Sequence, residues 1–417
     1  MNKMMILKQH ILLICFGIVI IGGAAAQSGG RIMYVAVKTL ELKSSTDFFA
    51  RDQGTLSYGD QVTVLRQEGK WVEVQSTAQS TVSGWTVSTS VTAKRITSSG
   101  GATSASATEI ALAGKGFNAA LENAYQAKGN LNYADVEVVE SLWVSKEDLY
   151  NFIIEGHLAQ GGTYTFVSAQ TDAISPEDAY YLGRAVGATI LTRYKIYTEA
   201  PELTIYLNKI CNTLAINSPK PELYNGYHVA ILDSAEINAF ATTGGHIFIT
   251  RGLLECADSE DALASVIAHE LAHIQLRHSM DVIETNRLAQ SLQGIASSAA
   301  KSAAAAAKVS DPALVFDTSI RDIVNTMVMT GYSQEQEFEA DATALSLLTT
   351  AAYEPSSLID MLKVLDRNQP RHAGGFNKTH PAPLLRISHV SWTVRRYSVP
   401  DTRAFRWDRF RATQQQD

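Results

Sequence analysis

Residues 268–273 read Ala-His-Glu-Leu-Ala-His and place two histidines four positions apart. On an α-helix, side chains at i and i+4 lie on one face, so His269 and His273 can reach the same metal ion. Glu270 projects about 100° further round the helix, near enough to act on water beside the metal without replacing a ligand. Zinc lowers the pKa of a water molecule bound to it. A nearby carboxylate can then take a proton from that water as the water attacks a peptide carbonyl. This spacing predicts zinc-dependent hydrolysis.

A catalytic zinc site takes three protein ligands and keeps one position open, so a third ligand is expected downstream. Glu337 and Asp341 also stand four positions apart, on a second helix-like stretch. One carboxylate of such a pair can bind the metal while the other accepts the second N–H of a ligating histidine. Taken alone, these acids would be interpreted as a solvated helix face. Beside the His-Glu-x-x-His segment, they are better interpreted as part of its metal site.

The surrounding sequence indicates which elements position these side chains. Strands are predicted over residues 227–232 and 245–250, followed by a long helix whose N-cap is Asp258 or Ser259. Acids at positions 258, 260 and 261 suit the positive end of that helix. The helix is apolar on several sides, so we expect it to be buried, and its ionisable side chains then need partners such as a metal. Another helix begins near Pro176.

Several motifs follow one another beyond residue 175. They are residues 238–241 (Asn-Ala-Phe-Ala), residues 244–254, the His-Glu-x-x-His helix, residues 337–341, and Thr379-His380-Pro381 with Arg386. With these motifs the chain resembles the HtpX-type and CAAX-prenyl-protease-type gluzincin metallopeptidases, and is closer to their soluble, periplasmic branch, which is implicated in envelope protein quality control. The resemblance implies that His269, His273 and Glu337 bind one zinc ion per chain, that Glu270 is the general base, and that Asp341 supports a ligand.

The resemblance also implies where a substrate binds. Residues 245–250 would form the edge of a sheet on which a peptide lies extended, in contact with Gly245, His246, Ile247 and Phe248. An ordinary core strand fits the same sequence pattern. Backbone pairing at a sheet edge would accept many sequences alike, which suits cleavage of misfolded proteins.

Three further side chains have less certain roles. His380 or Arg386 would stabilise the oxyanion of the transition state, although His380 fits equally well as a structural residue before Pro381. His278, five residues after His273, is expected at the surface. The alanine-rich residues 295–309 favour a closely packed helix, and their position between the two halves of the metal site also permits a mobile lid.

The N-terminal third has a different character. Residues 31–96 contain short runs of β-branched and aromatic residues at 32–37, 61–65, 71–74 and 84–87, separated by turn residues. They resemble a bacterial SH3-like domain. Trp71 and Trp85 would either line a groove for a cell-wall peptide or protein segment, or complete a small core. Residues 97–108 read as a flexible linker, and residues 109–175 as a mainly helical connecting region.

Composition restricts the function further. The chain has 417 residues, 46% of them hydrophobic, and a net charge of −7 without a basic block, which argues against nucleic-acid binding. Residues 1–26 resemble a cleaved secretory signal, with an uncleaved anchor as the alternative. After cleavage Cys211 and Cys256 remain, as free thiols or as a pair.

We therefore expect a multidomain protein, with a small all-β SH3-like barrel followed by an α+β, mainly helical, zincin-type metallopeptidase domain at residues 176–405. The expected function is an exported zinc metalloendopeptidase that cleaves unfolded or misassembled envelope proteins. One alternative is a chaperone-like or partner-binding protein with a largely latent metal site. Another is a cell-wall-associated hydrolase. Glu270 disfavours a purely structural site, which needs no general base.

Overall fold

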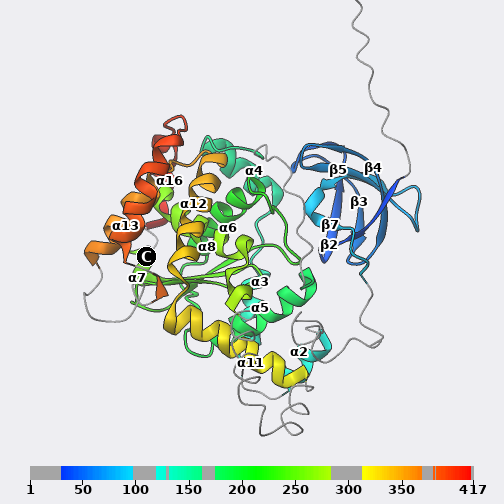
Figure 1. Ribbon diagram of the computed structural model, residues 1–417. Helices are drawn as coiled ribbons and strands as arrows, with labels where there is room; N and C mark the ends of the chain where they lie inside the picture. Colours follow the sequence, from blue (N-terminus) through cyan, green and yellow to red (C-terminus); the bar gives the residue numbers. More distant parts are fainter. Residues whose placement is uncertain are drawn as a thin grey trace, which may run out of the picture.

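The computed structural model describes residues 30–96, 119–127, 131–161, 174–282, 312–368, 379–380 and 382–414. The predicted signal (1–26), linker (97–108) and helix or lid (295–309) lie outside these ranges. Figure 1 shows a β-rich N-terminal part, in blue, beside a larger and mainly helical part in cyan to red. Within the described ranges, every helix is too short or too polar to span a lipid bilayer.

The N-terminal part is one antiparallel sheet of seven strands in the order β3-β2-β6-β5-β4-β1-β7. On β2 the residues from Thr39 to Leu42 alternate between solvent and core, with Leu40 and Leu42 buried and Glu41 exposed. The expected all-β region is confirmed, and β2, β3 and β7 add to the four predicted strands. Among the described strands β3 and β7 do not pair with each other, so the sheet does not close into the expected barrel. The strands are β1 (Arg31–Val35), β2 (Thr39–Lys43), β3 (Asp52–Ser57), β4 (Gln61–Glu68), β5 (Trp71–Ser76), β6 (Ser83–Val87) and β7 (Val91–Thr92).

Trp71 and Trp85 form a small buried cluster with Val87 in this sheet. The two tryptophans are only 7% and 5% exposed. Phe48 packs against the cluster, with its ring centroid 4.8 Å from that of Trp71, and it also packs against the core of the helical part. Of the two roles considered for these tryptophans, the structure therefore has the core role.

The N-terminal sheet contacts the segment that joins α6 (Pro201–Ile216) to β8 (His228–Leu232) in the helical part. The Lys70 ammonium donates to the carbonyl of Ile216 at 3.1 Å, at the C-terminal end of α6 where positive charge is favourable. Ser90 donates to the carboxylate of Glu222 at 2.5 Å, and burial raises the pKa of Glu222. The Lys38 N–H donates to the Tyr224 carbonyl at 2.7 Å. These contacts fix the sheet against the helical part.

The helical part contains a three-stranded sheet in the order β8-β10-β9. β10 (His246–Thr250) is parallel to β8 (His228–Leu232) and antiparallel to β9 (Ala239–Ala241). Every residue of the three strands is buried. Because β10 is paired on both sides, the expectation that residues 245–250 form a sheet edge is wrong, and β9 is the outer strand next to it.

The long predicted helix is α8 (Glu260–Leu276), and its start agrees with the sequence. The Ser259 hydroxyl accepts the N–H of Ala262 as N-cap. Every residue from Glu260 to Gln275 is buried, as expected for a helix that is apolar on several sides. Arg277 ends the helix in the left-handed conformation, with a φ of 65°.

The remaining helices surround α8 and the small sheet (Figure 1). Residues 109–175 contribute three of them, as far as they are described. Cys211 on α6 is buried, Cys256 is half-buried, and both are free thiols. The other helices are α2 (Ala119–Gln126), α3 (Tyr133–Ser141), α4 (Lys146–Glu155), α5 (Pro176–Ile190), α6 (Pro201–Ile216), α7 (Arg251–Leu254), α11 (Pro312–Asn325), α12 (Gln334–Thr350), α13 (Ser357–Asn368), α15 (Pro383–Thr393) and α16 (Arg403–Gln414), with short η1 (Ser88–Ser90), η2 (Thr326–Thr330) and η3 (Val394–Arg396).

Candidate metal centre

Two helices bring the predicted metal ligands together. α8 presents His269 and His273 on one face, with their Nε2 atoms 3.1 Å apart. α12 carries Glu337, whose carboxylate oxygens lie 3.4 Å from Nε2 of His269 and 3.5 Å from Nε2 of His273. The Ser333 side chain and Gln336 cap the start of α12 reciprocally, which fixes the turn that carries Glu337. The structure therefore unites the three side chains that the sequence proposed.

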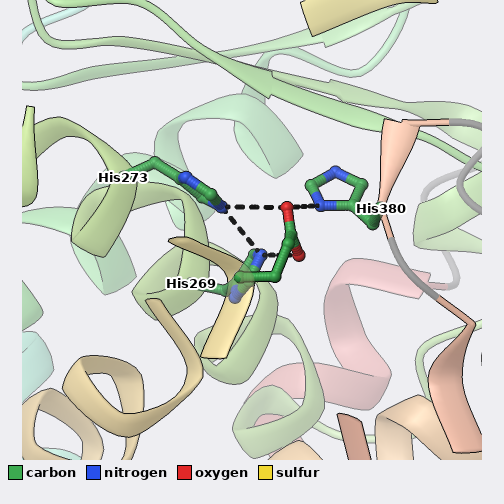
Figure 2. A group of neighbouring side chains, drawn as sticks. His269, His273 and His380 are labelled. Atoms are coloured by element: carbon green, nitrogen blue, oxygen red, sulfur yellow. Dashed lines mark hydrogen bonds and ion pairs between the residues drawn. The ribbon is translucent and has the colours of Figure 1, made fainter. Parts of the chain in front are cut away.

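His380 supplies a fourth donor to the same space. Its Nδ1 lies 2.8 Å from Oε1 of Glu337, and one donor atom from each of the four residues lies within 4.8 Å of the others. Figure 2 shows the three histidines pointing toward one another. The expected contact of His380 with a substrate oxygen remains a prediction.

The donors fit a zinc ion. Two imidazole nitrogens and a carboxylate oxygen are a common ligand set for catalytic zinc. Oε1 of Glu270 is buried, and no described residue forms a hydrogen bond with it. Oε2 of Glu337 is buried 3.4 Å from Nε2 of His269 and 3.5 Å from Nη1 of Arg386. A cation bound between these oxygens would offset the cost of burying them. His269, His273 and Glu337 are the side chains that would hold it.

A second layer of charged groups supports His269. Its Nδ1 lies 3.0 Å from Oδ1 of Asp341. The Arg386 guanidinium donates to both oxygens of Asp341, at 2.9 and 2.6 Å, and all three side chains are buried. Arg386 was expected to stabilise an oxyanion, whereas here its bidentate contact is with Asp341.

The charges of the centre shift its pKa values in different directions. Burial raises the pKa of Glu270, which makes it a better proton acceptor. Burial also favours a higher pKa for Glu337, but the charge of His380 and the hydrogen bond with His269 hold it well below its usual value. Burial and Arg386 oppose the proton on His269, yet Asp341 and Glu337 raise its pKa to about 9. Burial lowers the pKa of His273 well below the usual value.

Two residues beside His273 were not assigned to the site by the sequence. His278, expected at the surface, is 1% exposed, and its Nδ1 lies 2.9 Å from Nδ1 of His273. The left-handed turn at Arg277 returns the chain toward the helix, which simple helical spacing does not predict. The Tyr332 ring stacks on His273 with centroids 4.4 Å apart. Its only sequence signal is a position just before the cap of α12.

The residues expected to bind substrate at a sheet edge lie at and within the central strand of the sheet. His246, Ile247 and Phe248 are fully buried in the central strand β10, and Gly245 precedes it. Nε2 of His246 lies 2.8 Å from Oε1 of Glu140 on α3, so this side chain belongs to an internal network. β10 pairs with a strand on each side and offers no free backbone edge. The structure therefore gives no support to substrate binding by these four residues.

Comparisons with known proteins agree with this geometry. Residues 201–394 match the model of peptidase family M48. The chain is 25% identical over 292 residues to "Mitochondrial metalloendopeptidase OMA1" of Schizosaccharomyces pombe, covering 66% of this chain and 82% of that protein. It is 28% identical over 193 residues to the "Beta-barrel assembly-enhancing protease" of Escherichia coli strain K12, covering 45% of this chain and 38% of the relative. The match to the Yersinia pestis protein of that name also covers 38% of the relative, at 29% identity.

Proposed function

We propose that this chain is a zinc-dependent metalloendopeptidase, because residues 201–394 match the model of peptidase family M48. The observation that carries the proposal is the convergence of His269, His273 and Glu337 in a buried space next to Glu270. When bound there, zinc lowers the pKa of water and polarises a peptide carbonyl. Glu270 accepts the proton of the attacking water and returns it to the leaving amine.

The outer strand β9 is our proposed binding site for the peptide. In the described part of the chain no strand pairs with its second side. The Thr379 hydroxyl, next to His380, donates to the Asn238 side chain just before β9 at 3.2 Å, which brings this strand close to the metal centre. An extended peptide that pairs with β9 is bound through its backbone, so many sequences are accepted.

We further propose unfolded or misassembled envelope proteins as the substrates. The name of the Escherichia coli relative, β-barrel assembly-enhancing protease, links that protein to β-barrel assembly. A secretory signal at residues 1–26, a periplasmic location and one zinc ion per chain belong to the same proposal. So do a bacterial SH3-like domain at residues 31–96 and a zinc metallopeptidase domain at residues 176–405.

The proposed mechanism is tested with the parent chain and Glu270→Gln, using unfolded casein as substrate. The variant is expected to lose activity by about 10²- to 10⁴-fold while keeping its zinc, since it loses only the base. A chelator should abolish cleavage by the parent, and added zinc should restore it. Equal cleavage by both proteins would contradict the mechanism.

Two further assays separate the alternatives. A chaperone-like protein would suppress aggregation of unfolded casein equally in the parent and in Glu270→Gln, without cleavage by either. A cell-wall hydrolase would release muropeptides from purified sacculi. Either result with intact casein would replace the proposed function.

A further inference from the structure

We propose that His278 is a positioning residue that, through a relay ending at Glu339, fixes the ring of His273 for metal binding. This inference rests on the proposed zinc centre. Nε2 of His273 faces the site, 3.1 Å from Nε2 of His269 and 3.5 Å from Glu337. Its Nδ1 faces away and lies 2.9 Å from Nδ1 of His278. Nε2 of His278 continues to Oε2 of Glu339 at 3.4 Å.

One arrangement of protons satisfies every contact in this relay. A nitrogen that binds a metal offers its lone pair, so the proton of His273 must be on Nδ1. That N–H donates to Nδ1 of His278, which therefore carries its own proton on Nε2. This second N–H donates to the carboxylate of Glu339. His278 thus selects the tautomer of His273 that directs Nε2 to the metal.

The two histidine ligands are supported in different ways. His269 lies directly against the buried carboxylate of Asp341. At His273 an imidazole is inserted between the ligand and the carboxylate, and the Glu339 side chain is 67% exposed. Because solvent screens an exposed charge, His278 itself, and not Glu339, is expected to provide most of the orienting effect.

The fold holds His278 in place from several sides. The left-handed turn at Arg277 brings it back over the end of α8. Tyr332 stacks on His273 and also lies against His278, with ring centroids 5.9 Å apart. The ring of His273 is therefore fixed in plane by stacking and in rotation by the hydrogen bond from Nδ1.

The test compares His278→Leu, which removes the acceptor, with His278→Asn, whose carbonyl oxygen can replace Nδ1. Zinc Kd is measured by competition with a chromophoric chelator, and the visible absorption spectrum of the Co²⁺-loaded protein reports on ligand geometry. Loss of an outer partner of a metal ligand costs about 10- to 100-fold in affinity. We expect that loss and an altered spectrum for His278→Leu, and partial recovery for His278→Asn. Glu339→Gln should lose less than His278→Leu.

His389→Leu is the matched control, since His389 is exposed and stacks on Phe338 outside the centre. If His278→Leu does not fold, His278→Asn is compared with His389→Asn and with His273→Ala. Zinc binding as weak as that of His273→Ala would overturn the proposal. Parent-like affinity for His278→Leu, or equal losses for the leucine and asparagine variants, would also overturn it. A parent that binds zinc and cleaves casein in those cases leaves the proposed function intact, whereas a parent that does neither contradicts the proposed function itself.

Discussion

At the scale of single residues, the metal centre depends on compensation between buried charges. Asp341 would be costly to bury alone, and the bidentate contact with Arg386 offsets that cost. Burial tends to raise the pKa of Asp341, but Arg386 lowers it to about 2. The carboxylate therefore stays ionised and can orient His269 throughout the neutral range.

The proton on His269 makes metal binding depend on pH. Its pKa in the metal-free fold is raised from 6.5 to about 9, so the proton stabilises that fold fully below pH 6.5 and the stabilisation is lost as pH rises through 9. Zinc needs the unprotonated nitrogen. We expect zinc affinity to rise between pH 6.5 and 9, by up to about tenfold per unit, in titrations with a metal buffer. In Asp341→Asn the rise should level off nearer pH 6.5, and constant affinity over this window in the parent would contradict the assignment.

His380 offers a direct test of whether the centre is latent. A catalytic zinc keeps one position open, and a fourth protein donor closes it. His380→Ala is expected to raise the rate of casein cleavage by about tenfold, equivalent to removing a competing contact of about 1.4 kcal/mol. The measurement is the cleavage rate at equal zinc content. A fall of about 10²- to 10³-fold would instead assign His380 to the oxyanion.

At the scale of elements, the order of the small sheet decides where a peptide can pair. β10 has a partner on each side, whereas β9 has β10 on one side only among the described strands. The Thr242 N–H donates to the carbonyl of His246, and the Thr250 N–H to that of Asn238. Antiparallel pairing alternates, so the Phe240 amide faces β10 and the Ala241 N–H points to the free side.

Ala241→Pro therefore removes one outward N–H without removing a bond to β10. If substrate pairs with β9, kcat/KM should fall about fivefold, the effect of one hydrogen bond worth about 1 kcal/mol. Thermal unfolding should show that the fold is retained, since edge strands tolerate proline. A casein-derived peptide with one N-methylated amide gives the matched change on the substrate. Unchanged kcat/KM for the proline variant would exclude pairing at this position.

At the scale of the whole molecule, the N-terminal sheet is tied to the C-terminal end of the metal-binding helix. The segment between α6 and β8, which the sheet contacts, also forms hydrogen bonds with Gln275 near the end of α8. The Gln275 side chain donates to Ser218 at 2.7 Å. Lys220 donates to the carbonyl of Gln275 at 2.9 Å. Gln275 lies two residues after His273. Docking of the sheet therefore supports the end of α8 that carries His273, the first residue of the relay through His278 to Glu339.

Phe48→Ala is expected to weaken this docking. The side chain fills the contact between the Trp71 cluster and the helical core, and its loss should lower the free energy of unfolding by about 2 kcal/mol, less than the 3–5 kcal/mol of a fully buried phenylalanine. Urea unfolding and the rate of limited trypsin digestion are the measurements. Leu65→Ala is the control, since Leu65 is 51% exposed. Equal effects of the two substitutions would contradict a fixed contact.

The sequence by itself determined the features that depend on local spacing. A spacing of four residues put His269 and His273 on one helix face, and the start of that helix was expected at Asp258 or Ser259, of which the structure has Ser259 as N-cap. The alternation of β-branched residues indicated an all-β N-terminal part, and motif order indicated the peptidase family. The helix face, the helix start and the strand alternation follow from backbone geometry within a few residues. The family was indicated by the resemblance of several motifs and their order along the chain.

Only the tertiary structure decided the contacts between distant segments. Strand pairing puts β10 in the middle of its sheet, and packing buries Trp71 and Trp85. The carboxylate of Asp341 on α12 accepts hydrogen bonds from Arg386 on α15, a separate helix. The left-handed backbone conformation of Arg277 places His278, which was expected at the surface, in contact with His273. Such contacts depend on how whole elements pack, and side-chain periodicity along one element carries no information about its neighbours.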